Sequence, residues 1–326
     1  MMSLAIRGKQ EQTNKALASF AKSQLVLFQS RKKFAFLYCL ATVTGLFCMP
    51  GVLGALSSPN PDFLVIVQMT LPLPLTSLLA TAGTYIMNDL VDADLDRANG
   101  KKRPIPSGMV SKRQAWVFIA LAFGVAVLLT MITFRPINLL IVTLMLLIGI
   151  TYSAPRIALM KRFVVKTVSI SIFYILCALL GITSAYNLHF AVESPVVVAS
   201  VLLTLAIMVF ISSTLNDMGD VDGDKAAGRR TIPVVMGKDK TIKLTMILAA
   251  SVLALTWAFY GAALIAGQTS PVTPATTTAI ALVVLIMLGR MRNGFQNVEF
   301  MRSQHKKLFP LQIAIHASLI AGVMML

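Results

Sequence analysis

Two short acidic segments hold most of the carboxylates in this chain. Residues 88–96 read Asn-Asp-Leu-Val-Asp-Ala-Asp-Leu-Asp, and residues 216–224 read Asn-Asp-Met-Gly-Asp-Val-Asp-Gly-Asp. Together they contain eight of the thirteen acidic residues of the chain, at the same positions in the pattern. This internal repeat of a polar motif predicts two matched halves of one site.

The spacing of these residues favours a metal site. On a helix, Asn88, Asp92 and Asp96 lie at i, i+4 and i+8 and therefore share one face. Such a face repels itself unless a cation neutralises it, and Mg²⁺ usually binds one or two carboxylates together with phosphate oxygens. We therefore expect each segment to need the other to complete a metal cage.

Basic residues follow both acidic segments. Arg103-Pro104-Ile105-Pro106 comes after the first segment, and Arg230-Thr231-Ile232-Pro233 comes after the second. Cations beside a metal and carboxylate site are what a diphosphate leaving group requires, whereas any single Lys could simply belong to a solvated basic loop.

Tyr152, at the end of an apolar block, could donate a hydrogen bond to a phosphate or lie at a membrane interface. The candidate diphosphate-binding residues are Arg103, Tyr152, Lys161, Arg162, Lys225, Arg229 and Arg230.

The composition predicts an all-α polytopic membrane protein. Hydrophobic residues make up 56% of the chain and the mean hydropathy is +0.78, beyond the range of soluble domains. Nine apolar blocks are long enough, at about 20 residues, to cross a bilayer. We expect a nine-helix bundle around a central cavity over 34–326, preceded by a cytoplasmic segment, 1–33, in which 16–28 is an amphipathic helix or a disordered tail. The predicted spans are 34–57, 62–87, 114–134, 137–154, 167–187, 195–215, 242–267, 273–290 and 308–326.

The distribution of positive charge predicts the orientation. The net charge is +16, and with nine spans 28 of the 29 Lys and Arg residues lie on the side of the N-terminus, Arg135 being the exception. Because basic loops stay in the cytoplasm, we expect the N-terminus and both acidic segments to be cytoplasmic. The basic excess then indicates topology and contact with membrane lipids, and no basic patch interleaved with aromatic residues indicates a nucleic-acid partner.

Acidic helix ends, flanking cations and an apolar bundle together suit an allylic isoprenyl diphosphate. Neutralising the departing diphosphate lets the allylic C–O bond ionise to a carbocation, which an acceptor then attacks. Asp89 or Asp217 could take the acceptor's proton. The candidate catalytic residues are Asp89, Asp92, Asp217 and Asp220.

The motifs resemble those of the UbiA superfamily of intramembrane prenyltransferases. The resemblance rests on the Asn88-Asp89-x-x-Asp92-x-x-x-Asp96 pattern, the Arg-Pro-Ile-Pro-Ser-Gly loop at 103–108 and the second acidic segment. It implies Mg²⁺, two ions, and prenyl transfer from a diphosphate. Tyr152 and Lys161 match a Tyr and Lys segment of the family, and Lys166-Thr167 stands near the place of its usual Asn. The resemblance implies as metal residues Asn88, Asp92, Asp96, Asn216, Asp217, Asp220 and Asp224.

The same motifs leave several acceptors open. The loop at 103–108 is similar to that of the branch making archaeal ether lipids, which favours a glycerol-phosphate ether lipid acceptor and geranylgeranyl diphosphate as donor. The same loop is similar to chlorophyll and homogentisate prenyltransferases, so a chlorophyll-type or aromatic quinone-pathway acceptor stays open. A terpene cyclase needs no acceptor and would use the same ionisation site. A cation transporter is disfavoured, because its ionisable groups usually lie near the middle of the membrane.

Overall fold

The computed structural model describes residues 2–49, 71–98, 102–184, 195–265 and 270–324, together with Val52 and Val67. Every regular element in this part of the chain is helical. The helices are α1 (Met2–Phe47), α4 (Pro72–Val91), α5 (Ala93–Ala98), α6 (Lys112–Met131), α7 (Pro136–Ser153), the 3₁₀ turn η1 (Leu159–Lys161), α8 (Phe163–Ser184), α10 (Pro195–Met218), α11 (Val221–Ala226), α12 (Ile232–Met236), α13 (Lys238–Ile265), α14 (Val272–Gly294) and α15 (Val298–Met324).

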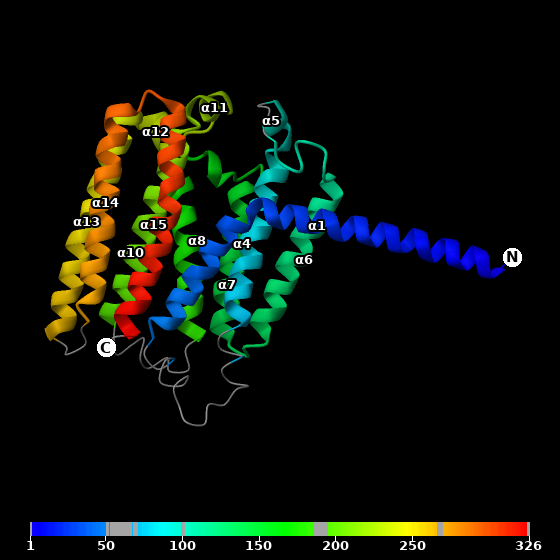
Figure 1. Ribbon diagram of the computed structural model, residues 1–326, viewed down its shortest axis with the longest axis horizontal. Helices are drawn as coiled ribbons and strands as arrows, with labels where there is room; N and C mark the ends of the chain where they lie inside the picture. Colours follow the sequence, from blue (N-terminus) through cyan, green and yellow to red (C-terminus); the bar gives the residue numbers. More distant parts are fainter. Residues whose placement is uncertain are drawn as a thin grey trace.

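The long helices form a bundle with their axes roughly parallel, and the short helices α5, α11 and α12 lie at one end of it (Figure 1). Six helices of the described chain are long and apolar enough to cross a membrane, namely α6, α7, α8, α10, α13 and α14. Helices α1, α4 and α15 pack into the same bundle and carry more polar residues. The chain is therefore a multi-pass integral membrane protein, as its composition predicted.

Helix α1 is longer than the sequence suggested. Residues 16–28 are helical, but they belong to one continuous helix from Met2 to Phe47, with no break at residue 33. The basic residues at 31–33 are good helix formers, and no Gly or Pro lies between Lys9 and Thr44 to stop the helix. The first part of α1 projects sideways from the bundle and the last part packs inside it (Figure 1). The predicted amphipathic segment is therefore part of the helix that enters the bundle.

The other helix ends differ from the predicted spans in two informative ways. Helix α4 begins at Pro72, so its prolines lie in the first turn, where their missing N–H groups cost nothing, instead of inside the span. Helix α15 begins ten residues before the predicted span and continues through Pro310. The predicted residues 50–51, 53–66, 68–70, 185–187, 266–267 and 325–326 lie outside the described part of the chain.

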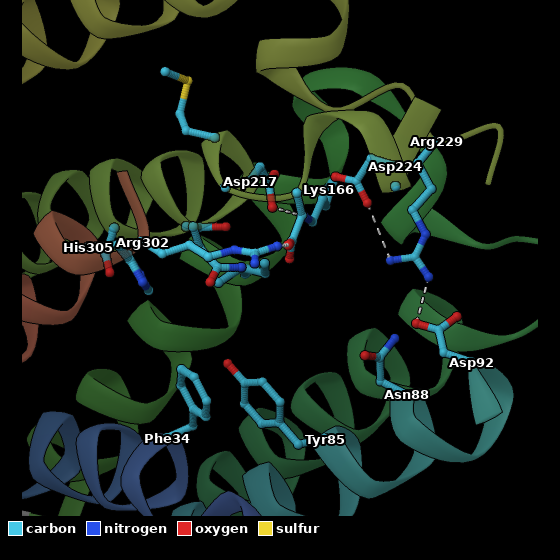
Figure 2. A pocket seen from close by; sticks show the side chains of 18 of the residues that line it. Phe34, Tyr85, Asn88, Asp92, Lys166, Asp217, Asp224, Arg229, Arg302 and His305 are labelled. Atoms are coloured by element: carbon cyan, nitrogen blue, oxygen red, sulfur yellow. Dashed lines mark hydrogen bonds and ion pairs between the residues drawn. The ribbon is translucent and has the colours of Figure 1, made fainter. Parts of the chain in front are cut away.

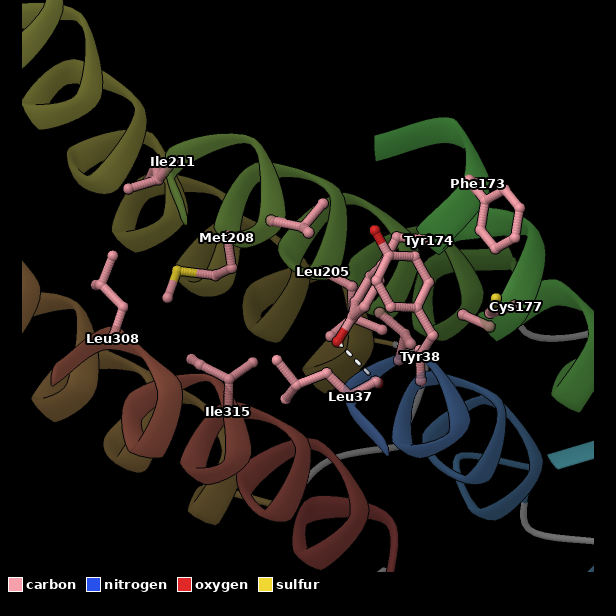
Figure 3. Close-up of a cluster of buried hydrophobic side chains, with 14 of the residues drawn as sticks. Leu37, Tyr38, Phe173, Tyr174, Cys177, Leu205, Met208, Ile211, Leu308 and Ile315 are labelled. Carbon is pink, nitrogen blue, oxygen red and sulfur yellow. Dashed lines mark hydrogen bonds between the residues drawn. The ribbon is translucent and has the colours of Figure 1, made fainter. Parts of the chain in front are cut away.

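The main hydrophobic core joins all the long helices, namely α1, α4, α6, α7, α8, α10, α13, α14 and α15. In Figure 3, side chains from α1 and α8 meet those of α10 and α15, and the Tyr174 hydroxyl donates to the carbonyl of Leu37 over 3.1 Å. A Cβ at Gly45 would come within 2.0 Å of the Ala178 carbonyl oxygen, so α1 and α8 approach as closely as backbones allow. This contact fixes α1, which carries residues of the site described below.

The two acidic segments occupy equivalent places in the fold. The first covers the end of α4 and the short helix α5, and the second covers the end of α10 and the short helix α11. Each therefore consists of a long helix, a one-residue or two-residue break and a short helix at the same end of the bundle (Figure 1).

Candidate functional site

A cavity of about 660 Å³ opens between the two acidic segments. Its walls come from α1, α4, α5, α7, α8, α10, α11, α13 and α15, and from the loops that follow the short helices. The predicted metal residues all line it: Asn88, Asp92, Asp96, Asn216, Asp217, Asp220 and Asp224. The fold thus brings together polar residues that are 128 positions apart in sequence.

The predicted i, i+4, i+8 geometry holds in the first segment although α4 ends at Val91. The Asp92 N–H donates to the Asn88 carbonyl over 2.9 Å, and the Asp96 N–H donates to the Asp92 carbonyl over 2.8 Å. The helical repeat therefore continues across the junction, and the three side chains stay on the cavity side. The second segment does the same at its end, where the Asp224 N–H donates to the Asp220 carbonyl over 2.8 Å.

Asp89 is held behind two arginines. Its carboxylate accepts hydrogen bonds from Arg31 of α1 and, over 2.9 Å, from Arg103 of the loop after α5. Arg103 also donates to Asp96 over 2.5 Å. Both arginines line the cavity, whereas Asp89, only 2% exposed, is not among the described lining residues. Asp89 therefore orients the arginines and is poorly placed to take a proton from an acceptor.

Arg229 joins the two acidic segments. Its guanidinium donates to Asp92 over 2.6 Å and lies 3.8 Å from an Asp224 oxygen (Figure 2). Burial of the Asp224 carboxyl raises its pKa above the ordinary value, and the neighbouring Lys166 and Arg229 charges oppose that shift. The ends of α4 and α10 thus face one shared pocket, which is the arrangement that the sequence interpretation requires.

The second segment keeps two carboxylate oxygens without hydrogen-bond partners. Asp217 is paired with Lys166 of α8 through Oδ1, and Asp220 is paired with Arg302 of α15 over 2.8 Å. The Oδ2 atoms of Asp217 and Asp224 are buried and accept no hydrogen bond from any described residue. Buried acceptors of this kind need a cation or a donor, because an unpaired polar group away from water is costly.

The donor set fits Mg²⁺ bound together with a phosphate, and does not form a closed cage. No three Asp, Glu, His or Cys side chains of the described chain converge tightly enough to hold a metal by themselves. The expectation that each segment needs the other to complete a metal site stays a prediction. Six carboxylates and six Lys or Arg side chains line the cavity, so its protein groups are already nearly neutral. Mg²⁺ commonly fills its remaining positions with water and substrate phosphate oxygens, which suits such a site.

The structure divides the predicted diphosphate-binding residues into two groups. Arg103, Tyr152 and Arg229 line the cavity. The remaining four are exposed and are absent from the described lining: Lys161, Arg162, Lys225 and Arg230. The Arg230 N–H donates to the Lys161 carbonyl over 3.0 Å, so these two residues hold the surrounding loops together instead.

Sequence reasoning missed five lining residues with basic side chains, namely Arg31, Lys166, Lys238, Arg302 and His305. Lys166 carried a usable signal, because it lies inside the apolar helix α8 and an ionisable residue within a span is a functional candidate by default. Arg31 is one of three consecutive basic residues, and only the structure identifies it as the one that turns inward. His305 and Arg302 lie across the pocket from Asp92 and Arg229 (Figure 2).

Beyond the charged groups, the cavity wall is aromatic and apolar. Phe34, Tyr38, Tyr85, Tyr174 and Ile170 form this part of the lining. A smaller cavity of about 80 Å³ shares Tyr38 and Tyr85 and extends between α4, α7 and α8. The site thus combines a polar end with an apolar wall.

Comparison with known proteins identifies the family. Residues 44–309 match the model of the UbiA prenyltransferase family. The chain belongs to the UbiA prenyltransferase family. Two of its relatives are the digeranylgeranylglyceryl phosphate synthases of Methanoculleus marisnigri and Natronomonas pharaonis. The first is 30% identical over 62% of this chain and 66% of the relative, and the second is 31% identical over 59% and 62%. The match thus spans slightly less than two thirds of each relative's length.

The fold of this UbiA family member is found in solved structures. A structure of digeranylgeranylglyceryl phosphate synthase superposes with a TM-score of 0.68 over 94% of this chain and 99% of that one, at 17% identity. A UbiA homologue from Archaeoglobus fulgidus bound to GPP and Mg²⁺ superposes with a TM-score of 0.62 over 92% and 99%, also at 17% identity.

Proposed function

We propose that this protein transfers an isoprenyl group from an allylic prenyl diphosphate to an acceptor in a Mg²⁺-dependent reaction. One observation carries the proposal: carboxylates from two matched segments line one cavity beside Arg and Lys side chains, and two of their buried oxygens have no partner among the described residues. A diphosphate with its metal ions would satisfy those oxygens and the cations together.

The acidic residues would hold two Mg²⁺ ions, one near each segment. On one side these residues are Asn88, Asp92 and Asp96, and on the other Asn216, Asp220 and Asp224, with Asp217 close by. When bound, Mg²⁺ supplies Lewis-acid neutralisation of the charge that develops on the diphosphate. The chain contributes by fixing these carboxylates on two rigid helix ends that share one pocket.

The cationic residues would hold the leaving group. Arg103 and Arg229 are anchored by carboxylates and still border the cavity, so their remaining N–H groups can bind phosphate oxygens. The Tyr152 hydroxyl can donate a further hydrogen bond. As the allylic C–O bond breaks, its electron pair leaves with the diphosphate oxygen, and these donors stabilise the resulting charge.

The aromatic wall would hold the prenyl chain and keep bulk water from the carbocation. Tyr38, Tyr85 and Tyr174 offer ring faces along the apolar part of the cavity, and such faces attract cations. Exclusion of water prevents hydrolysis before the acceptor reacts. In this scheme the acceptor oxygen forms the new C–O bond to the prenyl carbon and then loses its proton.

Asp217 is the residue that we assign as the proton acceptor. Of the two carboxylates that the sequence offered for this role, Asp217 lines the cavity and keeps Oδ2 unpaired among the described residues, whereas both oxygens of Asp89 face arginines. The oxygen that has just formed the C–O bond is a strong acid, so even an ion-paired carboxylate is basic enough to take its proton.

We propose a glycerol-phosphate ether lipid as the acceptor and geranylgeranyl diphosphate as the donor. The names of the relatives from Methanoculleus marisnigri and Natronomonas pharaonis support this choice. Purified protein should be incubated with geranylgeranyl diphosphate and Mg²⁺, with and without geranylgeranylglyceryl phosphate, and the lipids identified by mass spectrometry. We expect a doubly alkylated product only when the acceptor is present. A cyclic hydrocarbon or alcohol formed without acceptor would identify a terpene cyclase, and transfer to an aromatic acceptor alone would contradict the lipid assignment.

We further propose nine membrane spans, with the N-terminus and the mouth of the site in the cytoplasm. The support is the basic charge near the ends of the helices that border the site. In a variant lacking the three native cysteines, Cys at exposed Lys225 should react with an impermeant maleimide only after cells are opened. Cys at Phe134, which is 86% exposed in the turn between α6 and α7, should react in intact cells. The reverse labelling pattern would overturn the orientation.

A further inference from the structure

Lys166 is the charged residue of the site that lies deepest in an apolar helix. It belongs to α8, is 8% exposed, and its ammonium is hydrogen-bonded to Asp217 Oδ1. Burying both charges of such a pair is expensive, and the pair is often no more stable than apolar residues of the same size. The stability of the fold therefore does not explain why a lysine occupies this position.

The ammonium of Lys166 also has unused donor capacity facing the cavity. Lys166 lines the pocket, and Figure 2 shows its side chain between Asp217 and the opposite wall that carries Asn88 and Asp92. An ammonium has three N–H donors, and the structure gives Lys166 one carboxylate partner among the described residues. Lys166 can therefore bind a phosphate oxygen without releasing Asp217.

The arginines of the site are more heavily committed to carboxylates. Arg103 is shared between Asp89 and Asp96, and Arg229 is shared between Asp92 and Asp224. Arg302 is paired with Asp220 and is half-exposed, so solvent screens its charge. Arg31 is also buried with one carboxylate partner, but it binds Asp89 through two of its nitrogens. Lys166 is the buried lysine of the described lining, and its charge acts in a region of low dielectric, where it is strongest.

We propose that Lys166 binds the diphosphate of the substrate directly and without the help of a metal ion, in the role that the sequence assigned to Lys161. This inference rests on the proposed function and adds a residue to it. Lys161 lies five positions earlier, is exposed and is absent from the described lining. Lys166 lies near the start of α8 and lines the cavity. Lys166 thus provides a fixed positive charge at the leaving group before and after metal binding.

The test measures binding of inorganic pyrophosphate to the full-length protein in EDTA by calorimetry, so no turnover is required. We expect the wild type to bind, and Lys166→Met, which keeps the length and apolar stem of the side chain, to bind at least about tenfold more weakly. Lys166→Arg should retain most of the affinity. Lys161→Met removes the same charge from an exposed position nearby and should bind like the wild type.

A second variant separates binding from folding. Lys166→Met with Asp217→Asn removes both charges of the buried pair, which avoids an uncompensated carboxylate. It should also lose pyrophosphate binding while it keeps the elution profile and unfolding midpoint of the wild type. Wild-type affinity in this folded double variant, or no metal-free binding by the wild type, would overturn the role of Lys166.

The outcomes distinguish this inference from the proposed function. If the wild type turns over geranylgeranyl diphosphate with Mg²⁺ but the Lys166 variants bind pyrophosphate normally, prenyl transfer stands and the role of Lys166 is wrong. If the variants lose pyrophosphate binding but the wild type never consumes a prenyl diphosphate, the anion site stands and the proposed function is wrong.

Discussion

The two acidic segments have the same residue spacing and different electrostatic environments. In the first segment, Asp89 and Asp96 are bound by Arg31 and Arg103, and Asp92 is bound by Arg229. In the second segment, Asp217 and Asp224 each keep a buried oxygen with no partner among the described residues. The carboxylates of the first segment that border or lie behind the pocket are thus all paired with arginines, whereas the second segment keeps two buried oxygens unpaired among the described residues.

The equivalent residues Asp89 and Asp217 illustrate this difference most clearly. Asp89 has two arginine partners and lies behind them, whereas Asp217 has one lysine partner and borders the cavity. A repeat in sequence therefore does not imply a repeat in chemical role, because the role depends on which long basic side chains reach each carboxylate.

Breaking the arginine network of the first segment should have the largest effect, and it should be an effect on stability. Asp89→Ala leaves the buried Arg31 guanidinium without its carboxylate, and removal of one partner from a buried pair typically costs about 3 to 5 kcal/mol. Unfolding can be followed through the reactivity of the native free thiols, since Cys48 and Cys177 are buried. An unchanged unfolding midpoint would contradict the structural role of Asp89.

Removing one carboxylate from either side of the pocket should abolish turnover and destabilise the fold less than Asp89→Ala, because Arg229 keeps Asp224 and the pair of Asp220 with Arg302 is half-exposed. Asp92→Ala and Asp220→Ala should each lower kcat/KM by at least about 100-fold, the size expected for loss of one preorganised electrostatic group. The measurement is product formation at saturating Mg²⁺. If Asp220→Ala stayed within a few fold of the wild type, the site would not depend on both segments.

Removing Arg229, which joins the two segments, should have an intermediate effect on kcat/KM. Arg229→Gln removes a guanidinium that contacts both Asp92 and Asp224, and we expect kcat/KM to fall by about 10- to 100-fold, as for loss of one or more charge-assisted hydrogen bonds. Arg230→Gln is a matched control, because Arg230 is exposed and is absent from the described lining. Equal losses in the two variants would show that general positive charge is sufficient.

The smallest effect should come from Gly219, a position where the two segments differ in packing. A Cβ at Gly219 would lie 2.8 Å from Arg302 Cγ, so Gly219→Ala should displace this flexible side chain and weaken its pair with Asp220. Because that pair is exposed, the cost should be no more than about 1 kcal/mol in unfolding. The equivalent residue of the first segment, Val91, is 37% exposed, and Val91→Ala provides the comparison. A loss of activity as large as that of Asp220→Ala would mean that Arg302 does more than balance Asp220.

Much of the fold followed from local features of the chain. The apolar blocks 114–134 and 137–154 match α6 and α7 within a few residues, because a run of about 20 apolar residues has few alternatives to a membrane-crossing helix. The ends of α1 and α15 were harder to predict. Lys and Arg are compatible with both helix and loop, so the charged segments 31–33 and 302–307 carried no stop signal.

The amino-acid sequence by itself determined that the chain is a helical membrane protein with a repeated acidic motif whose Asn88, Asp92 and Asp96 share one face. These properties depend on hydropathy and on the helical repeat, both of which are local. The tertiary structure decided that Lys166 enters the pocket while Lys161 does not, and that Arg31 and Arg229 choose their particular carboxylates. The side chains of Lys and Arg are long and flexible, so their partners depend on how helices distant in sequence pack, which no local pattern specifies.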